Sequence, residues 1–381
     1  MYDAIVVGAR CAGSPTAMLL ARAGRRVLLL ERATFPRDTL STHYIHQSGV
    51  ARLARWGLLD RLAATGCPPI RRYRFDVGPF ALTGVPPAID GVDAAYSPRR
   101  YVLDRLLADA AVEAGAELRE GVTVHGLLTE DGRVTGVHGP GLHERARIVI
   151  GADGRNSIVA REAGAEIYED RGTLTCAYYA YWEGFQLDGV ELYPRPGRMI
   201  VTSPTHDGRN VVIVLWPQDE FEAVRADIEG AFEAAVALAP GLAARLRAGR
   251  RVEPFRGTRL LPNHFRTASG PGWALAGDAG HHKDPILALG ISDAFRDADL
   301  LAEAIEAGEP EAYGARRDAL ARPGFESTVA FAALQPPSAE QQALFAVLRD
   351  DQALTDRFFG TFAGTVAPEE LFSPAGAAAR S

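Results

Sequence analysis

The segment from Ala4 to Glu31 constrains the fold more than any other part of the chain. Two short apolar runs flank a helix of small residues expected at 12–23. This order predicts a β-α-β unit whose helix N-terminus offers free N–H groups and a positive dipole end to a phosphate. Gly8 permits a tight turn, and Gly13 lets the helix approach the strand closely. We therefore expect an α/β fold that opens with a nucleotide-binding turn.

One acidic and one basic residue refine this expectation. Glu31 ends the second strand, at the distance where a carboxylate accepts the hydroxyl protons of a ribose. Arg10 replaces the middle glycine of the G-x-G-x-x-G pattern, so its side chain must point away and pair with a phosphate or another segment. A plain strand-turn-helix would also match so degenerate a pattern.

Two later glycine–aspartate motifs identify the nucleotide. In 151–157 a strand delivers Asp153 to a glycine turn, although an Asx turn that only caps the next helix would look the same. In 273–305 a buried strand leads to Asp278, which can hydrogen-bond a ribityl or ribose hydroxyl. The turn 285–290 then opens a helix whose N-terminus would face the pyrimidine edge of a flavin, unless the motif is a strand-loop-helix without a ligand. Together the motifs indicate FAD.

Composition bounds the partners and the compartment. The chain has 381 residues, 41 basic and 48 acidic side chains (41 − 48 = −7) and three cysteines. This length suits two joined domains, and the mild negative charge disfavours nucleic acid or an anionic membrane. The scattered cysteines predict a reducing, cytoplasmic location without disulfides or a metal site. Asp3 and the interrupted apolar stretch argue against a signal peptide, and we expect no membrane span.

The rest of the chain predicts a second, inserted domain. Strand alternation runs from 173 to 216 with many Tyr and Trp residues, and helical periodicity dominates from 292 to about 363. We expect a Rossmann-like FAD-binding domain of discontinuous segments, an inserted β-sheet substrate domain, a helical C-terminal part, and a ligand cavity at the junction. The expected boundaries are 1–75, 98–168 and 266–325 for FAD binding, 76–97 and 169–265 for the substrate domain, and 326–381 for the C-terminal helices and tail.

The three motifs, in this order, resemble the class A FAD-dependent monooxygenase superfamily, the enzymes similar to para-hydroxybenzoate hydroxylase. Flavin-dependent halogenases and geranylgeranyl reductases belong to the same wider clan. Ala288 and Gly280 depart from the family loop, which has Gly and Ala at these positions. The resemblance implies these FAD-binding residues: Gly8, Ala12, Gly13, Glu31, Arg32, Arg37, Arg100, Val124, Asp153, Asp278, Pro285, Gly290 and Ile291.

The resemblance also implies a reaction. NAD(P)H would reduce FAD, O₂ would form a flavin C4a-hydroperoxide, and an aromatic or other largely apolar small molecule would be hydroxylated. A dehydrogenase or reductase of C–C or C–N bonds stays open, and a flavin-binding protein without turnover is a further alternative. Halogenation is disfavoured because the W-x-W-x-I-P motif is absent and no lysine precedes residue 283.

Candidate catalytic and substrate residues follow from chemistry and position. Lys283 is the only lysine of the chain, and it lies within the third motif. A phenolic substrate would need a base, and the candidates are His43, His46, His282 and Tyr178. Tyr178, Tyr181 and Trp216 are expected to line the substrate cavity, although alternation should place about half of the aromatic residues of this segment in the core. The oligomeric state is expected to be a monomer or homodimer.

Overall fold

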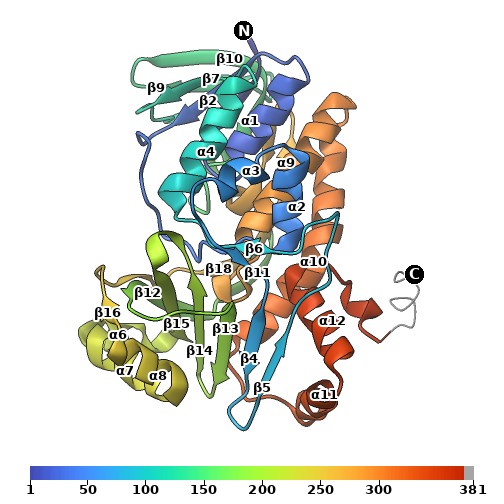
Figure 1. Cartoon of the computed structure of the whole chain (residues 1–381). Coiled ribbons are helices and arrows are strands. Elements are labelled where there is room, and N and C mark those ends of the chain that lie inside the picture. The colour runs from blue at the N-terminus through green and yellow to red at the C-terminus, as the bar shows by residue number, and fades with distance from the viewer. Residues whose placement is uncertain (373–381) are drawn as a thin grey trace.

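A computed structural model describes residues 1–372 of the chain, which fold around two large sheets (Figure 1). The first sheet has the order β19-β20-β10-β1-β2-β7, and the neighbours from β20 to β7 are parallel. Val7 pairs with Gly151 and Leu30, so these strands end at one edge. The strands are β1 (Tyr2–Val7), β2 (Val27–Glu31), β7 (Glu117–Glu120), β10 (Leu142–Gly151), β19 (Ser269–Gly270) and β20 (Trp273–Leu275).

Most of the helices cover one face of this sheet, and two antiparallel strands with the short helix α5 (Ile158–Glu162) cover the other (Figure 1). Ala4 and Val6 of β1 join the core under the helices, whereas Ile5 and Val7 join the core under the added strands. This alternation is what a strand buried on both faces requires. The covering elements are α1 (Gly13–Arg22), α2 (Gln47–Arg55), α3 (Leu59–Ala63), α4 (Arg100–Glu113), α5 (Ile158–Glu162), α9 (Gly290–Glu306), β8 (Gly126–Glu130) and β9 (Arg133–Gly139).

The second large sheet has the order β16-β12-β15-β14-β13-β4-β5, with β17 also paired to β12. Its strands are β4 (Tyr73–Asp76), β5 (Ala81–Gly84), β12 (Thr175–Glu183), β13 (Val190–Arg195), β14 (Arg198–Pro204), β15 (Asn210–Pro217), β16 (Arg250–Arg251) and β17 (Arg256–Thr258). The boundary expected after residue 75 therefore falls inside β4, which pairs with β13 and β5.

Helices also pack against the second sheet. One face is covered by α6, α7 and α8, while α11 and α12 lie beside β4 and β5 (Figure 1). The remaining elements are α6 (Phe221–Ala226), α7 (Ile228–Ala237), α8 (Pro240–Ala248), α10 (Tyr313–Ala332), α11 (Ala339–Asp350), α12 (Gln352–Ala363), β3 (Pro69–Ile70), β6 (Ala95–Tyr96), β11 (Ile167–Thr173), β18 (Pro262–Arg266) and β21 (His281–His282).

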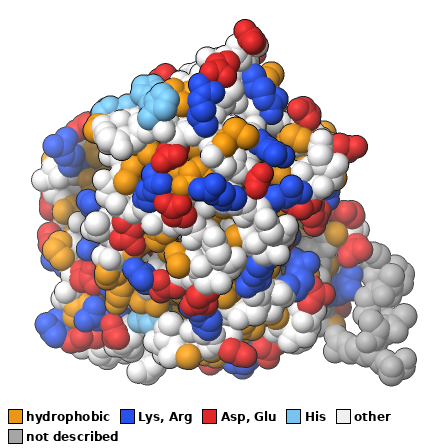
Figure 2. Space-filling view, turned by 90° about the horizontal axis from the view of Figure 1, so that it is seen from above, with side chains coloured by type: hydrophobic (Ala, Val, Ile, Leu, Met, Phe, Trp, Pro, Cys, Tyr) orange, Lys and Arg blue, Asp and Glu red, His pale blue; other side chains and the backbone are white. Residues whose placement is uncertain are grey.

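The surface mixes both signs of charge. Figure 2 shows basic and acidic side chains interspersed over the upper face of the molecule, with histidines gathered at one edge. Within residues 1–372, none of the helices is long and apolar enough to cross a membrane.

Candidate functional site

The strands β1, β10 and β20 end at one edge of the first sheet, where backbone segments approach one another closely, and we call this edge with the start of α1 the crevice. Gly8 has φ +99°, and a Cβ there would come within 2.4 Å of the Ala152 carbonyl oxygen. A Cβ at Gly13 would come within 1.8 Å of the Gly8 oxygen, and one at Gly277 would come within 3.0 Å of the Ala12 Cβ. Only glycine fits these approaches, so the start of α1 lies directly against the ends of β1 and β10. This cradle fits the pyrophosphate of a dinucleotide.

The acidic residue expected at the ribose lies beside this turn. Glu31 is 4% exposed, and its carboxylate accepts backbone N–H groups of Ala9 and Ala33, each at 3.0 Å. These two bonds orient the carboxylate toward the nucleotide turn. The Arg32 and Arg37 side chains follow on the exposed part of the next loop.

Arg10 points away from the turn. Its guanidinium donates to Asp104 of α4 at 2.8 Å, and its Cζ atom lies 5.8 Å from the centre of the Phe35 ring. Arg100 donates to the same carboxylate at 2.9 Å, and the Cys11 thiol does so at 3.5 Å. The substituted glycine position therefore carries a side chain that ties the turn to α4 instead of filling the cradle.

In the middle motif, the Asp153 side chain forms hydrogen bonds with residues at the start of the following helix, α5. The Asp153 carboxylate accepts the Ser157 hydroxyl at 2.5 Å and the Ile158 N–H at 2.7 Å at the start of α5, whose N-cap is Ser157. Burial raises the pKa of Asp153. The Asx-turn interpretation thus describes the contacts of this carboxylate. Val124, whose backbone the resemblance assigns to a site near the adenine, has its side chain buried in the core under the added strands.

The acidic and the basic residue of the third motif differ in burial. The Asp278 side chain is 49% exposed beside the crevice, whereas the Lys283 side chain is 4% exposed and forms an ion pair with Asp293 of α9. Arg296 donates to Asp293 at 2.6 Å. Although burial raises the pKa of Asp293, Arg296 and Lys283 hold it well below its usual range. Lys283 is thereby engaged in a buried ionic cluster.

His282 points the other way from Lys283 along β21. Its Nδ1 lies at hydrogen-bond distance from the Pro262 carbonyl oxygen, so Nδ1 is the N–H donor, and in the neutral ring Nε2 is the nitrogen with the lone pair. That nitrogen lies 4.0 Å from the Asp278 carboxylate. Of the expected catalytic side chains, His282 is the one that accompanies Asp278.

The loop after β21 leads to the start of α9. Burial raises the pKa of Asp284 to about 6, and its carboxylate accepts the Thr175 hydroxyl at 2.5 Å and the Ile286 N–H at 3.0 Å. Ala288 has φ +53°, a glycine-like conformation at the position where the family has glycine. Among the described residues, Leu289 at the N-cap gives α9 no side-chain cap, and Gly290 at its start is exposed. The first N–H groups of α9 are therefore available to a ligand.

An apolar cavity lies on the other side of this loop. Loop residues 285–288 form one wall, and the second sheet forms the opposite wall through β4, β13, β14 and β15. The lining residues are Thr42, Tyr44, His46, Tyr73, Val190, Leu192, Val201, Ser203, Ile213, Leu215, Pro285, Ile286, Leu287, Ala288 and Phe362.

His46 connects the cavity to the loop. Its Nε2 donates to the Leu287 carbonyl at 2.8 Å, and the Tyr73 hydroxyl donates to Nδ1 at 3.5 Å. Burial lowers the pKa of His46 to about 4. Both ring nitrogens are therefore occupied in the neutral form, so His46 is a positioning residue in this arrangement.

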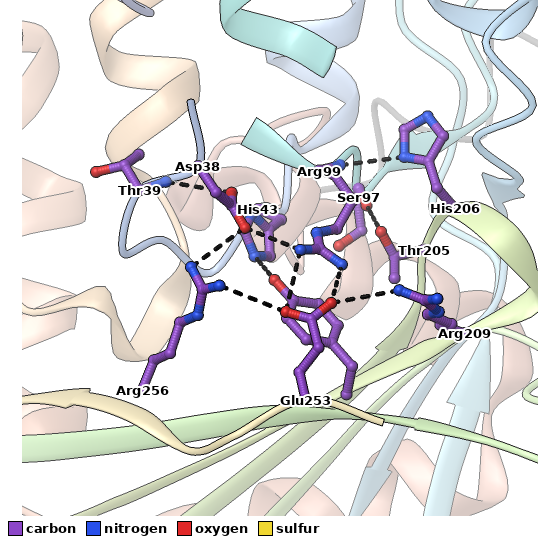
Figure 3. A network of polar contacts seen from close by, with 11 residues as sticks. Asp38, Thr39, His43, Ser97, Arg99, Thr205, His206, Arg209, Glu253 and Arg256 are labelled. Atoms are coloured by element: carbon purple, nitrogen blue, oxygen red, sulfur yellow. Dashed lines mark hydrogen bonds and ion pairs between the residues drawn. The ribbon is translucent and has the colours of Figure 1, made fainter. Parts of the chain in front are cut away.

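His43 belongs to a polar network beside the cavity (Figure 3). Its Nε2 bonds the Tyr181 hydroxyl, and burial lowers the pKa of His43 to about 3. Arg99 donates to Asp38 at 2.8 Å and to Glu253 at 2.6 Å, and its Cζ atom lies 4.0 Å from the centre of the Tyr181 ring. The network ties the loop that carries His43 to the second sheet.

The three expected substrate residues divide between the two faces of that sheet. Tyr178 stacks on Phe221, and Trp216 packs against Phe232, both under α6 and α7. Tyr181 faces the other way, toward His43. Because side chains alternate along β12 and β15, Tyr178 and Trp216 do not line the cavity described here.

Several residues that line the cavity belong to none of the three sequence motifs. Tyr44 lies in the polar segment after the first nucleotide turn, where a functional loop is common. Tyr73 and Phe362 come from β4 and α12. Only the folded arrangement brings these residues together.

Known proteins are similar to this chain in sequence. A family model described as an FAD binding domain matches residues 1–320 of the chain. Digeranylgeranylglycerophospholipid reductase of Methanocella arvoryzae is 27% identical over 331 residues, which cover 83% of this chain and 81% of the relative. Rifampicin monooxygenase of Streptomyces venezuelae is 28% identical over 370 residues, which cover 86% and 70%. Conditioned medium factor receptor 1 of Dictyostelium discoideum is 27% identical over 80% of this chain, which spans only 63% of that relative.

Solved structures show the same fold. The myxobacterial chondrochloren halogenase CndH superposes with a TM-score of 0.79 and 24% identity, covering 94% of this chain and 91% of that one. PqsL of Pseudomonas aeruginosa, a probable FAD-dependent monooxygenase, superposes with a TM-score of 0.76 and 20% identity, covering 92% and 100%. The expected α/β fold class is confirmed.

Proposed function

The chain belongs to the family of FAD binding domains within the class A flavoprotein monooxygenases and is an FAD-dependent oxidoreductase; from this premise we propose that it hydroxylates a largely apolar small molecule with NAD(P)H and O₂. One observation carries the proposal. Residues 285–288 connect Asp278 to α9 on the crevice side and also line the apolar cavity. A substrate in the cavity would therefore lie against the loop that the resemblance assigns to the flavin ring.

The geometry of the crevice suits FAD. The close backbone approaches at Gly8 and Gly13 would cradle the pyrophosphate, Glu31 would meet the ribose, and the uncapped start of α9 would face the ring. When bound, FAD would supply the redox chemistry, taking electrons from NAD(P)H and passing them to O₂. The same assignment gives supporting roles to Ala12, Arg32, Arg37, Arg100, Val124, Asp153, Asp278, Pro285, Gly290 and Ile291.

The chain's own residues would position the substrate and handle protons. Apolar side chains of β13, β14 and β15 would exclude water from the cavity. The partial positive charge at the start of α9 would stabilise negative charge placed there. His282 would be the proton acceptor beside Asp278, because its Nε2 carries a lone pair, whereas both nitrogens of His46 are occupied.

We also propose that the two large sheets belong to domains with different functions. The first sheet and its helices would form the FAD-binding domain. The second sheet, with β4 and β5 included, would form the substrate-binding domain. The C-terminal helices would complete it, since Phe362 of α12 lines the cavity.

An oxygen-isotope experiment tests the reaction. Purified FAD-loaded protein is incubated with NADPH or NADH, ¹⁸O₂ and 4-ethylphenol, and the products are analysed by mass spectrometry. A product that carries one ¹⁸O atom supports the monooxygenase. In a parallel anaerobic reaction with farnesol, a product that has gained two hydrogen atoms would instead establish a C–C bond reductase; the archaeal relative is named a reductase.

A further inference from the structure

The loop that follows β2 is attached to the rest of the molecule by side chains. Among the described residues, no backbone–backbone hydrogen bond joins residues 34–44 to another segment. The two ends of the loop are fixed, since the Phe35 N–H donates to Glu120 at 3.0 Å and His43 bonds the Tyr181 hydroxyl. Between these points, the hydrogen bonds and ion pairs that join residues 36–42 to other described segments all come from Asp38. Releasing Asp38 would therefore free this segment.

The Asp38 carboxylate lies between two arginines of other segments (Figure 3). Arg99 donates to it at 2.8 Å, and Arg256 donates to it at 3.4 Å. Although burial raises the pKa of Asp38, the hydrogen bond and charge of Arg99 hold it below its usual value, so the group is an anion at neutral pH. The loop thus places a carboxylate of the chain itself on a pair of guanidinium groups.

Arg99 is held in position without any help from the loop. Its side chain is 6% exposed, and its guanidinium donates to the Glu253 carboxylate at 2.6 and 3.3 Å. The Cζ atom of Arg99 also lies 4.0 Å from the centre of the Tyr181 ring. Because Glu253 and Tyr181 belong to the second sheet and its connections, Arg99 would remain in place if the loop moved. A guanidinium held in this way is already positioned to bind a carboxylate.

The charges of this network balance only incompletely. Three arginines, Arg99, Arg209 and Arg256, contact two carboxylates, since Glu253 also pairs with Arg209 at 3.3 Å and with Arg256 at 3.5 Å. Without Asp38, three positive charges would face the single negative charge of Glu253. A buried guanidinium that loses a counter-ion is strongly destabilising, so the network would then favour another anion in the same place. The Arg256 side chain is 39% exposed, so this place borders solvent.

We propose that Arg99 and Arg256 form a binding site for the carboxylate of a small molecule, that Asp38 occupies this site in the structure, and that a bound ligand displaces Asp38 together with residues 36–42. The ligand class is a small carboxylic acid, because Asp38 fills the place with a carboxylate and guanidinium groups match that planar anion. Asp38 thus acts as an internal competitor of the ligand. The proposal goes beyond the proposed reaction and does not depend on it.

A binding experiment with matched variants tests the proposal. The probes are benzoate and its neutral counterpart benzyl alcohol, and their affinities for FAD-loaded protein are measured by ligand-observed NMR. Asp38→Asn removes the internal competitor. Glu253→Gln is the matched control, because it removes the same charge from Arg99 and Arg256 but leaves Asp38 in the site. Arg256→Gln removes the more exposed of the two arginines without uncovering a buried charge.

The expected pattern separates displacement from a general change in charge. Asp38→Asn binds benzoate about tenfold more tightly than the wild type, the effect of one charge-assisted hydrogen bond that the ligand no longer has to replace. Glu253→Gln binds benzoate within about twofold of the wild type, and Arg256→Gln binds it at least threefold more weakly. Benzyl alcohol binds all four proteins equally. Saturating benzoate raises the melting temperature of Asp38→Asn more than that of the wild type, because only the variant has a vacant site.

Three results would overturn the proposal. An equal gain in Asp38→Asn and Glu253→Gln would show that only the overall charge matters and that no competitor is displaced. Equal benzoate binding by the wild type and Arg256→Gln would remove the arginine pair from the site, and this result does not require Asp38→Asn to fold. Absence of benzoate binding to a folded Asp38→Asn protein would exclude a carboxylate site. The proposed function fails by a separate sign, the absence of ¹⁸O from the product, which does not depend on these affinities.

Discussion

The crevice and the cavity share a loop but are built in opposite ways. Backbone builds the crevice, since the close approaches at Gly8, Gly13 and Gly277 leave no room for side chains. Side chains build the cavity, and they come from segments spread between residues 42 and 362. A site made of backbone tolerates little change in its glycines and is visible in short motifs. A site made of side chains depends on strand register and can change its ligand without changing the fold.

The largest effect should come from filling the crevice. Gly13→Val places a branched side chain where even a Cβ would lie 1.8 Å from the Gly8 carbonyl oxygen. We expect the variant to be purified without flavin and to bind FAD at least 100-fold more weakly, because the helix can no longer approach the strand. Flavin absorbance after purification and titration with FAD measure the loss.

A distant glycine provides the control for this variant. Gly241→Ala on α8 adds a Cβ with nothing within 4 Å, so FAD binding should be unchanged. Circular dichroism distinguishes a folded protein without FAD from an unfolded one. Full flavin content in a folded Gly13→Val protein would contradict the assignment of the crevice.

The next effect concerns the buried charges that support the crevice. The Asp104 side chain is 0% exposed and pairs with Arg10 and Arg100. Asp104→Asn would leave two guanidinium groups without their counter-ion, and we expect a loss of about 3 kcal/mol in the free energy of unfolding. Urea denaturation measures it.

The same helix offers a matched comparison. Asp109 forms an exposed i,i+4 pair with Arg105 at 2.6 Å, so Asp109→Asn should cost less than about 1 kcal/mol. Equal costs for the two variants would mean that Arg10 and Arg100 do not depend on Asp104.

The difference between the crevice and the cavity also explains which site residues can be predicted from the sequence. Gly8, Glu31 and Asp278 could be found because each lies at the end of a strand within a short motif. Lys283 stands out in the sequence only because it is rare, and rarity does not indicate where a side chain points; the structure places it in an ion pair with Asp293 of α9. Residue type alone suggests Tyr178 and Trp216 for the cavity, whereas the pleat of β12 and β15 determines which face of the sheet each side chain occupies. Phe362 lies far from any motif, so only tertiary packing reveals it.

A smaller effect should appear as acid sensitivity of the cavity side. Burial lowers the pKa of His46 to about 4 and that of His43 to about 3 in the folded protein. Between these values and about 6.5 the unfolded chain binds more protons, so stability falls as the pH falls, by about 1.4 kcal/mol per pH unit for each histidine. Asp284, whose pKa burial raises to about 6, acts in the opposite direction between its unfolded and folded values.

One substitution isolates the contribution of His46. His46→Gln should reduce the slope of unfolding free energy against pH by about 1.4 kcal/mol per unit between pH 6 and 4, as measured by urea denaturation at several pH values. His125→Gln, which changes an exposed histidine on the first sheet's side of the molecule, is the control. An unchanged slope in His46→Gln would show that His46 is accessible to protons in the folded state.

The smallest effect lies where the two regions meet. Ala288 lines the cavity and belongs to the loop before α9, and its φ of +53° is unfavourable for a residue with a Cβ. Ala288→Gly should therefore stabilise the protein by about 0.5–1 kcal/mol, the left-handed strain relieved less the extra entropy of glycine in the unfolded chain. Gly308→Ala makes the reverse change at φ +78° with nothing within 4 Å of the added Cβ, so it should destabilise by a similar amount. A different result is informative: Ala288→Gly is destabilising while Gly308→Ala behaves as expected. The packing of the Ala288 methyl group in the cavity wall would then outweigh the strain of its backbone. In that case the loop would contribute more to the stability of the cavity than to that of the crevice.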